Sequence, residues 1–193
     1  GFEPLQIERQ EIERERRKGP ASPFAITFPQ GMMWGILACT AAFAISLVTE
    51  RSHGTLARVL MAPVGRAQIL AGKGLACFIT IVGMLCALYL LGTLAFKVRA
   101  GSLALLAMAI VCSASCFVGI MMFLSVLGKS ETAINGIAWP ILMAMAFTGG
   151  GAIPLFFMPD WLRAASNFSP VKWTILALEG AIWRDFTFLG ALI

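Results

Sequence analysis

Residues 50–73 read ERSHGTLARVLMAPVGRAQILAGK, a basic segment that separates two long apolar segments without a charged residue. Its four cations are Arg51, Arg58, Arg66 and Lys73, against one acid, Glu50. Apolar side chains between positions 56 and 61 have the spacing of one face of a short helix, and Pro63 cannot continue that helix. The pattern predicts an amphipathic helix that lies on a bilayer surface or presents its side chains to a soluble partner. A solvated connector with ordinary membrane-proximal charges fits the composition equally well.

The composition places the chain among membrane proteins. Of its 193 residues, 59% are hydrophobic and only 13% are charged. The net charge of +5 is divided among short breaks between apolar runs, so the continuous basic surface that binds nucleic acid is missing. We expect no nucleic-acid partner, and the cations suit lipid headgroups instead.

Residues that build catalytic, metal and nucleotide sites are sparse. All five cysteines lie inside apolar runs without a CxxC pair, and the single histidine, His53, cannot form a histidine metal site. Gly128, Lys129 and Ser130 look like the end of a phosphate-binding loop, but that motif needs a glycine where Phe123 stands. We therefore expect no catalytic residue, no metal, no bound cofactor and no ATPase site in this chain.

Uncharged segments predict an all-α membrane protein, a polytopic bundle of transmembrane helices. The expected spans are residues 31–49, 74–96, 102–127 and 133–158, with the start of another at 186–193. Residues 159–185 are amphipathic and predict two short helices at the bilayer interface. Residues 1–22 have too few apolar side chains to form a core, so we expect the tail end of a larger soluble domain there and the transmembrane domain at 23–193.

The fourth expected span is the least regular. Pro140 removes a backbone donor near its start, and a run of glycines is followed by another proline. The residues expected to break this helix are Pro140, Gly149, Gly150, Gly151 and Pro154. Because irregular backbone is tolerated at membrane depth only where protein or a watery cavity covers it, the break is expected inside the bundle.

The four expected spans contain no Asp, Glu, Lys, Arg or His. Carriers driven by protons or sodium usually need an ionisable group at depth to couple ion movement to transport. If the protein moves a substrate uphill, we therefore expect its energy to arrive from outside the membrane. Two alternatives stay open: a scaffold or assembly factor that transports nothing, and an ion-coupled carrier whose ionisable group lies elsewhere in a longer chain.

The basic segment also matches a longer pattern, E-R-x-x-G-T-L-x-R-x-L-x-x-P-x-x-R-x-x-I-x-x-G-K, without a gap. The matching positions are Glu50, Arg51, Gly54, Thr55, Leu56, Arg58, Leu60, Pro63, Arg66, Ile69, Gly72 and Lys73. In this pattern the segment resembles the cytoplasmic loop of the permease subunits of type-2 ABC exporters, whose coupling helix sits in a groove of the ATPase subunit. Ala57 departs from the family, which often has Glu at that position.

The resemblance covers residues 28–193 and implies the transmembrane subunit of an ATP-driven exporter in the inner membrane of a prokaryote. It implies three partners: an ABC ATPase subunit that binds the ATP, a second permease copy or similar subunit, and the lipid bilayer. The residues that it assigns to ATPase coupling are Glu50, Arg51, Gly54, Thr55, Leu56, Arg58, Leu60, Met61, Pro63 and Arg66. It also implies that residues 50–73 form the coupling loop and that residues 1–22 end a truncated extracytoplasmic domain. Apolar and small side chains along the spans favour an amphiphilic substrate.

Overall fold

The computed structural model of the chain describes residues 23–54, 65–96, 101–152 and 158–182. Its helices are α1 (Pro23–Ser52), α3 (Arg66–Phe96), α4 (Leu103–Leu127), α5 (Glu131–Thr148), α6 (Asp160–Ser166) and α7 (Pro170–Ile182), and these described ranges contain no β-strand. Three apolar stretches are long enough to cross a bilayer: Thr27–Ser52, Ala67–Ala95 and Leu103–Leu127. The predicted fold class, an all-α membrane helix bundle, is confirmed.

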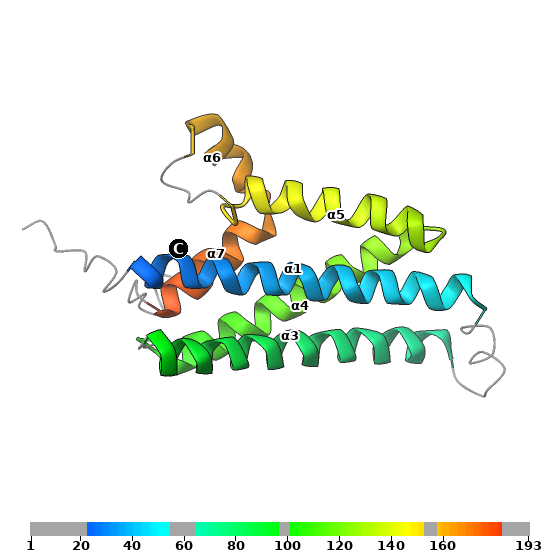
Figure 1. The fold of residues 1–193 in the computed structure, drawn as a ribbon, viewed down its shortest axis with the longest axis horizontal. Helices are drawn as coiled ribbons and strands as arrows, with labels where there is room; N and C mark the ends of the chain where they lie inside the picture. Colours follow the sequence, from blue (N-terminus) through cyan, green and yellow to red (C-terminus); the bar gives the residue numbers. More distant parts are fainter. Residues whose placement is uncertain (1–22, 55–64, 97–100, 153–157, 183–193) are drawn as a thin grey trace, which may run out of the picture.

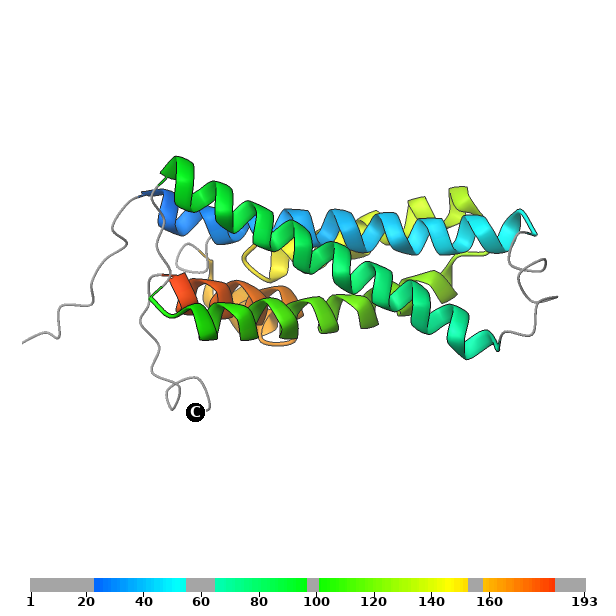
Figure 2. The same cartoon turned by 90° about the horizontal axis from the view of Figure 1, so that it is seen from below.

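Helix α1 lies at the centre of the bundle, in contact with α3, α4, α5 and α7 (Figures 1 and 2). Two close approaches to α3 depend on glycine. A Cβ atom on Gly35 would lie 2.7 Å from Met84 Sδ, and one on Gly92 would lie 2.4 Å from Phe28 Cζ. Because helices in lipid associate through close packing rather than through a hydrophobic force, these glycines fix how near α1 and α3 approach.

Apolar side chains from every described helix except α6 fill the core. The largest fully buried members are Met32, Met33, Ile36 and Leu37 of α1, Ile81 and Leu85 of α3, Phe117, Met121 and Leu124 of α4, Ile134 and Leu142 of α5, and Ile175 of α7. By contrast, α3 and α4 turn large side chains outward as well, among them Leu94, Phe123 and Val126. Such an outer face suits lipid.

The first two helices are longer than the spans expected from the uncharged runs. α1 begins at Pro23 rather than at residue 31, and α3 begins at Arg66 rather than at residue 74. The first charged residue is a poor guide to where a helix ends here. A helix can continue beyond the bilayer into water as long as the backbone groups at its ends have hydrogen-bond partners. The expected loop at residues 50–73 is therefore shorter, since its two ends belong to α1 and α3.

The helix expected at residues 133–158 runs instead from Glu131 to Thr148. Pro140 lies inside it, so the break predicted at this proline is wrong; α5 continues through the position where the proline N–H is missing. The helix ends where Gly149 follows, and Gly150 has a φ of +90°, a left-handed conformation that glycine adopts without strain. Pro154 lies outside the described residues.

Two short helices occupy the segment predicted to be interfacial, but only α6 projects from the bundle (Figure 1). α7 is buried against α4 and α1 through a stripe that includes Val171, Ile175 and Leu178. The apolar stripe of α7 therefore faces neighbouring helices, which an amphipathic helix can do as readily as face a bilayer surface, and the interfacial position of α7 stays a prediction. Glu179, 8% exposed, is an acid that this prediction had assigned to a wet face. The position of α6 at the bilayer interface stays a prediction.

Candidate functional site

The site predicted from the sequence begins at the last turn of α1. Glu50 and Arg51 belong to this turn, where Arg51 is a cation favourably placed at a helix C-terminus. His53 N donates to Thr49 O at 3.0 Å, and Ser52 Oγ donates to the same carbonyl at 3.0 Å. Gly54 follows with a φ of +71°, the left-handed conformation with which glycine commonly ends a helix. The described part of the chain is interrupted after this residue.

The described chain resumes at Gly65, which precedes the first residue of α3. Gly65 O accepts from Gln68 N at 3.0 Å, while Gln68 Oε1 accepts from Gly65 N at 3.0 Å. The second bond is half of a capping box, in which a Gln at the third helical position satisfies the cap N–H. Glycine has no side chain for the other half, so its carbonyl oxygen accepts from Gln68 N instead. The cap explains why α3 begins at Arg66, within the basic segment.

An ion pair between Glu50 Oε1 and Lys73 Nζ joins the end of α1 to the second turn of α3. The two side chains are 34% and 27% exposed, respectively, so the pair is only partly open to solvent. Partly exposed pairs contribute on the order of 1 kcal/mol, mainly by fixing geometry. Lys73 was missing from the predicted coupling residues, although it is the last position of the matched pattern and Glu50 is the first.

The central part of the predicted site lies outside the described residues. Its members are Thr55, Leu56, Arg58, Leu60, Met61 and Pro63. The amphipathic helix predicted there, and its contact with an ATPase, stay predictions. What the structure brings together is the base of this segment: Glu50, Arg51 and Gly54 on one side and the start of α3, with Arg66, on the other.

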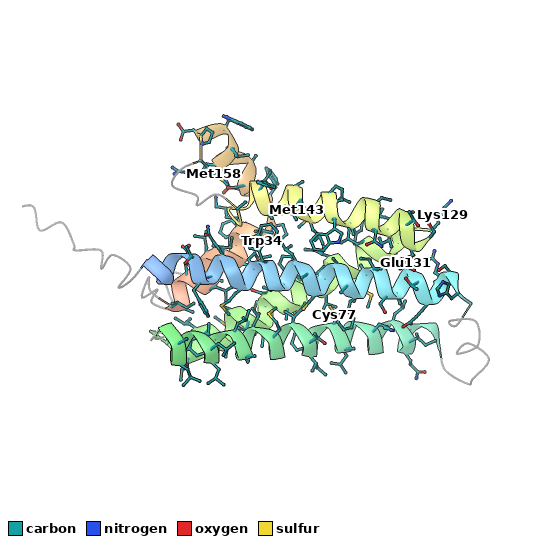
Figure 3. The ribbon with its side chains drawn as sticks, viewed as in Figure 1. Trp34, Cys77, Lys129, Glu131, Met143 and Met158 are labelled. Atoms are coloured by element: carbon teal, nitrogen blue, oxygen red, sulfur yellow. The ribbon has the colours of Figure 1, made fainter. Side chains whose placement is uncertain are left out.

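The connection between α4 and α5 lies at the same end of the bundle (Figure 3). Lys129 and Glu131 are exposed there, and Ser130 Oγ accepts from Ala133 N at 3.2 Å as the N-cap of α5. Glu131 stands in the first turn of α5, where a carboxylate is favourable. Charged side chains of α1, α3 and the α4–α5 connection therefore gather at one end of a bundle whose candidate spans are otherwise uncharged.

The glycine turn after α5 is the other predicted feature, and it lies against α1. Gln30 Nε2 donates to Gly150 O at 3.1 Å, and Trp34 Nε1 donates to Gly151 O at 3.2 Å. Figure 3 shows Trp34 between α1 and the C-terminal end of α5. Sequence reasoning missed both donors because they are separated from the glycines by more than a hundred residues and have no local pattern.

Within the part of the chain that the structure describes, no group of three or more His, Cys, Asp or Glu side chains could hold a metal ion. The five cysteines are free thiols. The charged end of the bundle and the glycine turn are therefore the two features around which a function can be argued.

The family model described as "ABC-2 type transporter" matches residues 6–183. The chain is 27% identical over 131 residues to the probable multidrug ABC transporter permease YbhR of Escherichia coli, a match that covers 67% of this chain and 35% of that protein. It is 30% identical over 140 residues to the probable doxorubicin resistance ABC transporter permease protein DrrC of Mycobacterium tuberculosis, which covers 71% of this chain and 50% of that protein. The chain thus spans between a third and a half of the length of these relatives. No solved structure matches it.

Proposed function

Because the chain belongs to the ABC-2 type transporter family, we propose that it is the transmembrane subunit of an ATP-driven exporter. The ATP is bound and hydrolysed by a separate ABC ATPase subunit, and this chain supplies no nucleotide site or cofactor of its own. The protein works in the inner membrane of a prokaryote, with the α1–α3 connection on the cytoplasmic side. Its cargo is amphiphilic, in keeping with relatives whose names refer to a multidrug transporter and to doxorubicin resistance.

The observation that carries this proposal is the charged end of the bundle. The ion pair between Glu50 and Lys73, which we call the clamp, joins α1 to α3 at the base of the predicted coupling helix. Lys129 and Glu131 lie at the same end. Toward the other end, residues 31–49 of α1, residues 74–96 of α3 and the whole of α4 contain no charged residue. Spans of this kind have no Asp, Glu, Lys, Arg or His to couple ion movement to transport. The soluble ATPase subunit, which binds the charged end, therefore supplies the force.

The second permease copy is placed on the exposed side of α1. Gly31, Ala38 and Ala42 are exposed there and recur at helical spacing. Small side chains let another helix approach closely, whereas the large outward side chains of α3 and α4 suit lipid. The substrate path then lies between the two copies, beside α1 and α5.

The direct test is co-reconstitution of the full-length protein with an ABC ATPase subunit that co-purifies with it. ATP-dependent movement of a fluorescent amphiphile across the vesicle membrane is expected, and it should stop when the ATPase carries a catalytic substitution. A scaffold would bind the ATPase without moving the dye. An ion-coupled carrier would move it in response to a proton or sodium gradient without ATP.

We expect the Glu50–Lys73 clamp to transmit movement rather than to stabilise the folded protein. Glu50→Lys or Lys73→Glu alone should lower ATP-driven transport about fivefold, since a partly exposed ion pair is worth about 1 kcal/mol. The double variant, which restores the pair with its charges exchanged, should recover at least half of the wild-type rate. Arg163→Glu is the matched control, because it inverts an exposed cation on α6, away from the charged end. An equal loss of ATP-driven transport in the single and double variants would show that the ion pair does not transmit movement.

A further inference from the structure

The turn that follows α5 is built from buried backbone. Gly149, Gly150 and Gly151 are all buried, and the carbonyl groups of the last two cannot be satisfied by α5, which has already ended. A backbone carbonyl without a partner at membrane depth costs several kcal/mol in hydrocarbon, by order of magnitude. The partners come from another helix: Gln30 and Trp34, one helical turn apart on α1, donate to these two carbonyls.

The same turn is tied to α5 and α7 by bonds that do not involve α1. Gly149 N donates to Met145 O at 2.9 Å, Gly151 N donates to Ala146 O at 2.8 Å, and Ser169 Oγ donates to Met145 O at 3.0 Å. A Cβ atom on Gly149 would lie 2.5 Å from Val171 Cβ, so the start of α7 packs directly on the turn. The end of α5, the turn and the start of α7 therefore form one packed unit. Gln30 and Trp34 of α1 are joined to this unit by their hydrogen bonds to the two carbonyl groups of the turn.

We propose that Gln30 and Trp34 form a latch that holds the Gly149–Gly151 turn against α1 and keeps shut the end of the substrate path that is distant from the α1–α3 connection. α1 also carries Glu50 of the clamp, so one continuous helix joins the clamp to the latch. Displacement of α1 by the ATPase breaks the two hydrogen bonds and frees the packed unit. The source of that displacement rests on the proposed function, whereas the latch itself rests on the contacts.

Hydrogen–deuterium exchange of the full-length protein in lipid nanodiscs, without ATPase or nucleotide, tests the latch. The variant Gln30→Leu with Trp34→Phe removes both donors and keeps apolar bulk. Peptides that span residues 145–152 should exchange about tenfold faster, because two hydrogen bonds of ordinary strength are lost. The matched control is Asn135→Leu with Trp139→Phe, which removes an amide and an indole from α5; Trp139 has the same 37% exposure as Trp34. Equal exchange of these peptides in the wild type and the latch variant would overturn the proposal.

Dye leakage from vesicles gives a second readout that a purely structural contact would not change. Without ATPase or nucleotide, the latch variant should leak an amphiphilic dye several-fold faster than the control variant. Faster exchange without leakage would overturn the role of the latch in closing the path. Because neither assay uses ATP, failure of ATP-driven transport in the wild type would count against the proposed function and leave the latch standing.

If the latch variant does not insert into membranes, the single variant Gln30→Leu, which keeps Trp34, takes its place. Exchange of the same peptides should then be about fivefold faster than in the wild type, because one hydrogen bond of ordinary strength is lost. Equal exchange in this variant and the wild type would overturn the proposal.

Discussion

Aspartate at both Leu56 and Leu60 is expected to abolish stable binding of the ATPase while leaving the permease folded in the membrane. Burial of two leucine side chains in a partner's groove contributes about 3 kcal/mol or more, and this loss alone weakens the Kd about a hundredfold. ATP-driven transport should fall to background for the same reason. Co-purification of the two subunits, followed by a binding titration in detergent, measures the effect.

Methionine at both Leu56 and Leu60 is the matched control for this double substitution. It changes the same two positions but keeps an apolar side chain of similar volume. It should leave ATPase binding within about fivefold of the wild type, because volume-conserving apolar exchanges have small effects. Unchanged binding and transport in the variant with Asp at 56 and 60 would remove the coupling helix from the proposed function.

The second large effect is expected at Gly149, where alanine should lower the free energy of unfolding by about 3 kcal/mol. Its Cβ atom would lie 2.5 Å from Val171 Cβ, 2.7 Å from Ser169 Oγ and 2.8 Å from Met145 O. Val171 Cβ and Met145 O cannot move away by side-chain rotation, so the backbone or a helix must shift. For a chain of this size the loss corresponds to a Tm about 10 °C lower.

Gly136→Ala is the comparison for this substitution, on the same helix. A Cβ atom at Gly136 would meet nothing within 4 Å, and alanine favours a helix over glycine by up to about 1 kcal/mol. The Tm of this variant should therefore equal or exceed that of the wild type in the same detergent. Similar Tm values for the two alanine variants would contradict the tight packing of α7 on the turn.

The parts of the fold that follow from local composition were predictable. Uncharged runs identify the apolar stretches of α1, α3 and α4, because twenty or so residues without charge have few stable locations other than a bilayer. The end of α5 at the glycine run also follows from a local cause, the loss of helix propensity. The passage of α5 through Pro140 does not, because local propensity alone predicts an interruption at a proline inside a helix.

Features that depend on distant contacts were not predictable in the same way. α7 has the apolar stripe of an interfacial helix, and only the position of α4 and α1 shows that the stripe faces protein. Gln30 and Trp34 resemble ordinary residues at a membrane boundary until Gly150 and Gly151 are brought beside them. The pairing of Glu50 with Lys73 was not predicted either, because the pattern that they begin and end assigns no contact between them.

The length of α1 has a mechanical consequence. Between Glu50 and Gln30 the helix measures about 30 Å, at 1.5 Å per residue. A tilt of roughly 10° about the Glu50 end would carry Gln30 sideways by about 5 Å. This arc exceeds the 3.1 Å that separates Gln30 Nε2 from Gly150 O. α1 can thus act as a lever, and a pivot of modest angle at the membrane surface is enough to pull a donor away from its acceptor on the opposite side of the bilayer.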